Sequence, residues 1–148
     1  MNPNSLFNNI AIEALSLAFV LEQAEQLSMS KVLLISPIIS HEKLLGHLAR
    51  SSTSILSFEK YFIEHLSNFS NFNRRFYSEI VTSVNAIQLL WKLDIVALEN
   101  GNLQLLTPIN YDKKMGKRAE KIYKAAPNIS ALIDEKIETL YLNLRIEL

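Results

Sequence analysis

The chain of 148 residues contains no cysteine, only three glycines and only four prolines. The absence of cysteine excludes disulfides, thiolate metal sites and cysteine nucleophiles, and it favours a reducing compartment. The N-terminus has no basic region of the kind that begins a signal peptide, and the first apolar stretch contains Glu13 and Glu22, so neither a signal peptide nor a membrane span is predicted. We therefore expect a cytoplasmic protein that makes no contact with a membrane.

Charge and hydrophobicity limit the partners that the chain can attract. Fifteen basic residues balance fifteen acidic ones, so no overall field draws it toward nucleic acid or an anionic membrane. Hydrophobic residues make up 49% of the chain, which indicates apolar surface beyond what a small core hides and favours a subunit of a larger assembly. We expect one domain, residues 1–148, with three segments: residues 1–56, 57–108 and 109–148.

The first helix is predicted to begin at Asn8 or Asn9, either of which can cap it, and to end at Leu27. Apolar side chains cover more than half of its circumference. Such a helix is usually central in a fold, or it meets a partner.

The next apolar run, residues 31–39, contains Pro37, which forbids a straight helix through it and disfavours a central strand. We predict a buried helix that is broken near Ser36. Ser40 is then expected to cap a short helix, which ends at the serine-rich turn 51–54.

Two helices are predicted in the middle segment. Ser57 caps the first, whose core residues are spaced at i, i+4 and i+8: Phe58, Phe62 and Leu66. The second is predicted from Asn73 to Lys92, with its apolar stripe formed by Phe76, Ile80, Val84, Ile87 and Trp91.

A β-hairpin follows these helices. The apolar runs Ile95–Leu98 and Leu103–Leu106 flank Asn100-Gly101, and Asn-Gly is the strongest short hairpin signal because both residues tolerate positive φ. Two helices, a turn and a hairpin in this order describe a winged-helix-like unit. The fold class predicted is therefore mainly α: a compact helical domain containing a winged-helix-like unit with one β-hairpin.

The C-terminal segment is predicted to form two helices. The first is interrupted or started near Gly116 and ends before Pro127. The second is capped by Asn128 or Ser130 and ends at Ile146.

A basic cluster lies between Asp112 and Lys124, where six cations face two carboxylates. If this segment is helical, four of the cations share one face at i, i+3, i+4 and i+7: Lys114, Lys117, Arg118 and Lys121. Such a stripe suits a nucleic-acid backbone or an acidic partner, and a solvated helix face is an equally good interpretation.

The winged-helix-like unit itself is better suited to protein than to DNA. Its wing tip, residues 99–102, contains Glu99 and no Lys or Arg, so it would repel phosphates. We expect it to dock on a partner through five apolar residues: Phe76, Ile80, Trp91, Leu98 and Leu103.

No motif of an enzyme is present. His41, His47 and His65 lack metal-ligand spacing and are expected at the surface or in helix caps. No GxSxG elbow exists, and three dispersed glycines cannot form a P-loop or a dinucleotide fingerprint. We expect no catalytic residue, no metal, no cofactor and no small-molecule substrate.

The order of features resembles a known family. An Asn followed by an apolar-Ala-Glu-Ala helix (residues 9–23), an apolar run with one Pro leading to a His (residues 32–41), a Phe-rich helix and a helix-hairpin (residues 75–106) are similar to the middle component of bacterial three-component ABC systems of the Lamassu antiphage type. This resemblance implies a structural role, in which the protein bridges a chromosome-maintenance-like ATPase and an effector, such as a nuclease. The family has no catalytic motif to carry over.

Two functions follow as hypotheses. The first is a non-enzymatic adaptor that joins ATPase and effector through apolar surface, with DNA contacted by the basic stripe within the complex. The second is a winged-helix DNA-binding transcriptional regulator, which requires salt-sensitive duplex binding by the isolated protein. A small hydrolase remains only as a residual hypothesis.

Overall fold

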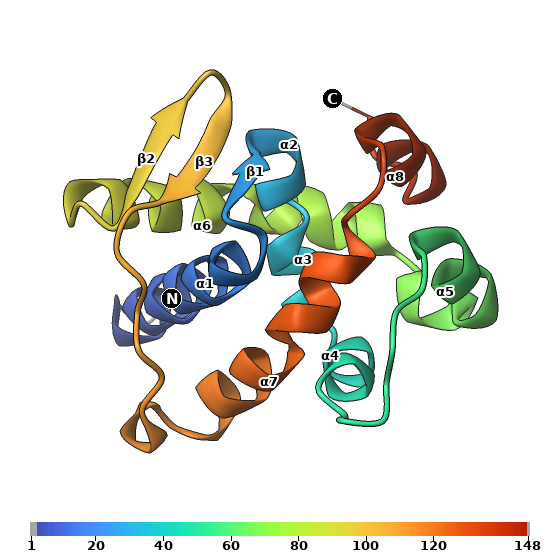
Figure 1. Cartoon of the computed structure of the whole chain (residues 1–148), viewed down its shortest axis with the longest axis horizontal. Coiled ribbons are helices and arrows are strands. Elements are labelled where there is room, and N and C mark those ends of the chain that lie inside the picture. The colour runs from blue at the N-terminus through green and yellow to red at the C-terminus, as the bar shows by residue number, and fades with distance from the viewer. Residues whose placement is uncertain (1–2, 148) are drawn as a thin grey trace.

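The computed structural model describes residues 3–147 and is mainly α-helical, with one small antiparallel sheet (Figure 1). The predicted fold class, a mainly α domain with a β-hairpin, is therefore confirmed. The elements in chain order are α1 (Pro3–Ala24), β1 (Gln26–Ser28), α2 (Met29–Val32), α3 (Ile35–Ile39), α4 (Glu42–Leu48), α5 (Phe58–Glu64), the 3-10 helix η1 (Leu66–Phe69), α6 (Phe72–Lys92), β2 (Val96–Glu99), β3 (Asn102–Leu105), the 3-10 helix η2 (Lys113–Met115), α7 (Lys117–Leu132) and α8 (Ile137–Asn143).

Helix α1 is the centre of the fold, as its apolar circumference predicted. Five consecutive side chains, residues 17–21, are each at most 1% exposed, so the helix is covered on every side along this stretch. It packs against α6 and α7, which approach it from different directions (Figure 1). Residues from all three predicted segments join α1 in one hydrophobic core.

The predicted ends of α1 are wrong. The helix begins at Pro3, where the fixed φ of proline suits a first turn, rather than at Asn8 or Asn9. It ends at Ala24 rather than at Leu27, because Glu25 adopts a left-handed φ of 64°. The chain then extends into β1, a third strand that the periodicity did not reveal.

The hairpin forms as predicted. Glu99 pairs with Asn102, which leaves a two-residue turn in which Asn100 has φ 53° and Gly101 has φ 78°. Two positive φ angles define the type I′ turn that Asn-Gly favours. Strand β1 pairs with β3 along its other edge, so the strand order is β1-β3-β2.

Gly101→Ala is expected to lower the free energy of unfolding by about 1–2 kcal/mol, because alanine resists the left-handed conformation. No atom lies within 4 Å of the position that a Cβ would take, so the cost is conformational rather than a clash. Chemical denaturation measures the difference. Gly46→Ala, inside α4, is the matched control and should be neutral or stabilising by up to about 1 kcal/mol. Equal losses for the two variants would contradict this assignment of the turn.

The segment from Met29 to Leu48 contains three short helices instead of two. The break falls at residues 33–34, not near Ser36, because Pro37 is the third residue of α3, where its missing N–H needs no helical partner. His41, not Ser40, caps α4: its Nδ1 accepts a hydrogen bond from the Leu44 amide at 3.1 Å.

Helices α5 and α6 are close to their predicted positions. The Ser57 hydroxyl oxygen caps α5 by accepting the Lys60 amide at 3.2 Å, as predicted. Leu66, predicted in the core, is exposed because α5 ends at Glu64 and η1 turns away from it. Helix α6 begins at Phe72, one residue before the predicted start.

The predicted break before Pro127 is wrong. Helix α7 continues through this exposed proline to Leu132, and its ribbon bends part-way along its length (Figure 1). Pro127 removes one amide from the helix, which bends a helix without necessarily ending it. The chain breaks instead between Ile133 and Lys136, before α8.

Candidate protein-interaction site

The outward face of α6 carries a mainly apolar row, which the exposed Gln88 interrupts between Val84 and Trp91. Tyr77, Val81, Val84 and Trp91 are 44%, 66%, 42% and 60% exposed, and they are spaced at i, i+4, i+7 and i+14. This spacing places all four on one side of the helix. We call these four residues the outer α6 stripe. The opposite side of α6 packs into the core through Phe72, Phe76, Ser83, Ala86, Ile87 and Leu90.

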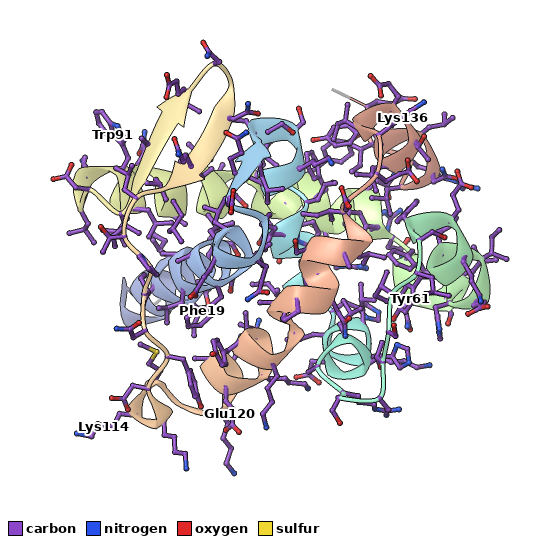
Figure 2. All side chains as sticks on the ribbon, viewed as in Figure 1. Phe19, Tyr61, Trp91, Lys114, Glu120 and Lys136 are labelled. Carbon is purple, nitrogen blue, oxygen red and sulfur yellow. The ribbon has the colours of Figure 1, made fainter. Side chains whose placement is uncertain are left out.

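The hairpin extends this apolar surface. Helix α6 contacts β2, and Trp91 lies beside that strand (Figure 2). Three further leucines are more than half exposed around this end of the helix: Leu93 after α6, Leu98 on β2 and Leu106 after β3. Large side chains that are left in water along one helix and the adjoining hairpin are typical of a surface that binds another protein.

The five predicted docking residues are distributed over two faces. Phe76 and Leu103 are fully buried in the core, Ile80 is partly buried, and Trp91 and Leu98 are exposed. The predicted stripe on α6 is rotated by roughly one-sixth of a turn from the face that is actually buried. It therefore mixes core residues with surface ones, and Trp91 and Leu98 are the two that lie on the open surface.

Two exposed cations, Arg74 and Lys92, lie near opposite ends of α6, and few others are close to the hairpin. The turn from Glu99 to Asn102 contains no Lys or Arg. Arg75 is committed to the fold, because its Nε donates to the Pro37 carbonyl at 3.1 Å and its Nη1 donates to the Ser70 carbonyl at 2.8 Å. This face lacks the row of positive charges that phosphate binding requires.

The four residues of the predicted basic stripe do not share one helical face. Lys114 lies on η2, and Gly116, with φ 99°, separates it from α7, which starts at Lys117. Arg118 turns inward, where its Nη2 donates to the Ile39 carbonyl at 3.3 Å. Only Lys117 and Lys121 remain together, and they face α4. Lys114 lies at the foot of the molecule in Figure 2, beneath the level of α1.

A polar cavity of about 360 Å³ lies between α1, α3, α6 and α7, and sequence reasoning missed it. Glu13 and Glu79 both line it, together with Arg118. The Ser40 hydroxyl donates to Glu79 Oε2 at 3.0 Å, and the Ser83 hydroxyl donates to Glu13 Oε1 at 3.5 Å. The sequence feature that could have revealed the cavity is Glu13, a carboxyl group among the apolar residues of the central helix.

Burial changes the proton affinity of both carboxyl groups. It raises the pKa of Glu13 to about 7, although hydrogen bonds from Ser36 and Ser83 oppose the rise. Burial also raises the pKa of Glu79, against the Ser40 hydrogen bond and the charges of Arg75 and Arg118. The cavity can therefore exchange a proton near neutral pH. Among residues 3–147, no three His, Cys, Asp or Glu side chains are grouped so that they could hold a metal ion.

The histidines have structural partners. His41 caps α4, as expected of a capping histidine, and His47 Nδ1 lies 2.6 Å from the Tyr61 hydroxyl. Burial raises the pKa of Tyr61 to about 12, so this phenol stays protonated. The His65 ring packs at a tilt against Tyr61, with ring centroids 4.4 Å apart and an interplanar angle of 31°. This cluster joins α4 to α5.

Within residues 3–147, no helix combines the length and the apolar character that crossing a membrane requires.

Comparison with known proteins identifies the family. Residues 4–148 match the family model described as "ABC-three component (ABC-3C) system Middle Component 3". No curated protein matches the chain, and no solved structure matches it. The match covers nearly the whole chain and agrees with the resemblance to a middle component. The chain therefore belongs to the Middle Component 3 family of ABC-three component systems.

Proposed function

We propose that the protein is a non-enzymatic adaptor that links a chromosome-maintenance-like ABC ATPase to an effector, such as a nuclease, in an antiphage defence complex of the Lamassu type. Its membership of a middle-component family supports partnership with the other components of such a system. The observation that carries the proposal is the outer α6 stripe, because a subunit that joins two others needs surface that is uncovered in the isolated chain.

The chemistry of this surface favours a protein partner. Tryptophan and tyrosine are the side chains that most often dominate protein interfaces, and the stripe supplies both, at Trp91 and Tyr77. Val81 and Val84 lie between them, so the strip is apolar over its first two turns, and Gln88 adds one amide before Trp91. An amphipathic helix or an apolar groove of another component fits such a strip.

The winged-helix-like unit predicted for residues 57–108 would comprise α5, η1, α6 and the hairpin, with α6 immediately before the wing and β1 as a third strand beside β3. In winged helices that read DNA, the corresponding helix enters the major groove with polar and basic side chains outward. Here α6 presents Val81, Val84 and Trp91 outward, with Arg74, Gln88 and Lys92 as its exposed basic and amide side chains, and the wing tip has no cation. The transcriptional-regulator alternative therefore gains no support from this unit.

Changing the valines of the stripe tests the proposal. A double variant, Val81→Asp with Val84→Asp, is expected to weaken binding to the other purified components of the system by at least about tenfold, because two charges would be buried against an apolar partner. Isothermal titration calorimetry and size-exclusion chromatography of the co-expressed components measure the loss. Both positions are exposed, so the fold should be retained, and circular dichroism checks this.

Leu56→Asp with Ile63→Asp is the matched control, since it adds the same two charges at residues that are 78% and 69% exposed, in the loop before α5 and on α5, outside the stripe. It should leave binding unchanged. Wild-type affinity in the double variant of the stripe would refute the stripe as the docking surface. Equal losses in that variant and the control would show that added charge, rather than the stripe, weakens the complex.

A further inference from the structure

A second surface lies between α4 and α7, and its character is opposite to that of the outer α6 stripe. A groove of about 240 Å³ separates the two helices. Its lining contains four cations and one carboxylate, on a floor of two small residues. The lining residues are Gly46, Ala49, Arg50, Lys117, Glu120, Lys121 and Lys124.

The cations come from both sides of the groove. On α7, Lys117, Lys121 and Lys124 are spaced at i, i+4 and i+7, which places them in one row along the helix. Arg50 follows α4 on the opposite side. Arg50 is far from α7 in sequence, so only the packing of α4 against α7 brings these charges together.

Gly46 forms part of the floor of the groove, beneath Lys121. A Cβ at this position would lie 3.5 Å from both Cε and Nζ of Lys121, so the lysine side chain lies directly over α4. Together with Ala49, Gly46 gives the groove a floor without bulky side chains. The charged ends of the surrounding residues are therefore what a ligand in the groove would meet.

Most of the positive charge in the groove is uncompensated. Lys124 Nζ forms an ion pair with Glu120 Oε1 at 2.9 Å, and this is the one ion pair formed within residues 3–147. Arg50, Lys117 and Lys121 have no carboxylate within ion-pair distance in that part of the chain. All three are exposed to water, where they are available to an anion.

We propose that the α4–α7 groove binds the phosphate backbone of a nucleic acid. Phosphate contacts need only cations at suitable spacing, whereas an acidic protein partner also needs apolar anchors to bind tightly. The groove offers three free cations and no large apolar side chain, so the phosphodiester backbone is the better fit. DNA and RNA share this chemistry.

The proposal does not depend on the adaptor function. The groove is formed by α4 and α7, whereas the outer α6 stripe meets the hairpin, which lies across α1 from α4 in the view of Figure 1. Two surfaces of opposite chemistry allow one chain to hold a protein and a nucleic acid at the same time. Loss of one kind of binding should leave the other intact.

Fluorescence anisotropy with the full chain tests the groove. The probes are a labelled 20-base-pair DNA duplex, single-stranded DNA and RNA of the same sequence, each titrated over a series of salt concentrations; 20 base pairs is a length of about two helical turns. With three free cations, the logarithm of the association constant for the duplex should fall with the logarithm of salt concentration with a slope of roughly −3. Whichever probe binds most tightly identifies the natural source of the phosphates.

The groove variant is Arg50→Gln with Lys121→Gln, which should weaken binding of the preferred probe by at least about tenfold at low salt and reduce the slope by about two. The matched control is Lys60→Gln with Lys136→Gln, which removes the same net charge from α5 and from the turn before α8. It should bind like the wild-type chain.

Three results would overturn the proposal. The first is that no probe binds at low salt. The second is that the groove and control variants lose equal affinity, and the third is that the chain binds poly-glutamate in preference to all three nucleic acids. The last result would assign the groove to an acidic protein. Thermal unfolding of the variants, expected to change little at these exposed positions, separates a binding loss from a folding defect.

Discussion

Phe76→Ala is expected to lower the free energy of unfolding by about 3–5 kcal/mol, whereas Val81→Ala should change it by less than about 0.5 kcal/mol. The two residues are little more than one helical turn apart on α6, but Phe76 is 1% exposed and Val81 is 66% exposed. The phenyl ring meets Tyr141 edge-on, with centroids 5.9 Å apart. Its removal would leave a cavity beneath α8.

Urea denaturation followed by circular dichroism measures both free energies, with the m-value as a check that each transition stays two-state. Tyr141 also donates a hydrogen bond from its hydroxyl to the Ser30 carbonyl at 2.7 Å, which ties α8 to the start of α2. Loosening the tyrosine in Phe76→Ala should therefore weaken α8 first, visible as faster amide exchange there. Similar costs for the two substitutions would show that the inner and outer faces of α6 are wrongly assigned.

The sequence predicted correctly those features that residues close together in the chain determine. Ser57 caps α5 through an amide three residues away, and Asn100-Gly101 forms the hairpin turn through its own backbone preferences. The central position of α1 followed from apolar residues over more than half of its circumference, which leaves little of the helix for water. These features require no knowledge of what lies elsewhere in the chain.

The ends of helices and strands were predicted wrongly where contacts with distant parts of the chain determine them. Strand β1 has only three residues, and it exists because β3, far along the chain, offers its free edge to residues 26–28. The apolar pattern of α1 runs on to Leu27, because a buried leucine at this position fits the spacing of a helix as well as the strand in which it lies. At Pro127 the error was the opposite: a helix end was predicted where the helix continues. Packing of α7 against α1 stabilises the helix on both sides of the proline.

The sequence indicated the kinds of residue that form the two candidate surfaces, but not which of these residues lie together on the folded chain. Helix α6 has apolar residues at Phe76, Ile80, Val81 and Val84, so several faces satisfy a core periodicity, and only packing against α1, α3 and β2 selects one. The basic segment after residue 112 was visible as composition. The contribution of Arg50 could not be predicted, because nothing in the sequence around Arg50 or in the serine-rich turn 51–54 indicates that α4 packs against α7.

Glu13→Gln is expected to remove a large pH dependence of stability. Glu13 is 2% exposed, and burial raises its pKa from 4.5 to about 7 in the folded chain. A folded state that binds the proton more tightly than the unfolded one is most favoured at low pH, and below pH 4.5 this contribution is complete. It is lost progressively as the pH rises to about 7, and the loss then levels off.

The expected size is roughly 3 kcal/mol, since each unit of pKa difference corresponds to about 1.4 kcal/mol. Glutamine keeps the shape and the hydrogen-bonding capacity of the side chain but carries no charge at any pH. The variant should therefore match the wild-type chain near pH 4 and exceed its stability by up to roughly 3 kcal/mol at pH 8. Glu79, whose pKa is also raised by burial, adds a residual dependence of the same sign in both proteins.

Urea denaturation at a series of pH values from about 4 to 8 measures the two stability curves. Glu22→Gln is the matched control, because Glu22 is an exposed carboxyl on the same helix, and it should follow the wild-type curve. A Glu13→Gln curve that parallels the wild type between pH 4.5 and 7 would contradict the raised pKa. A loss of stability at pH 8 would mean that the ionised carboxylate is compensated inside the cavity, where Arg118 supplies a positive charge.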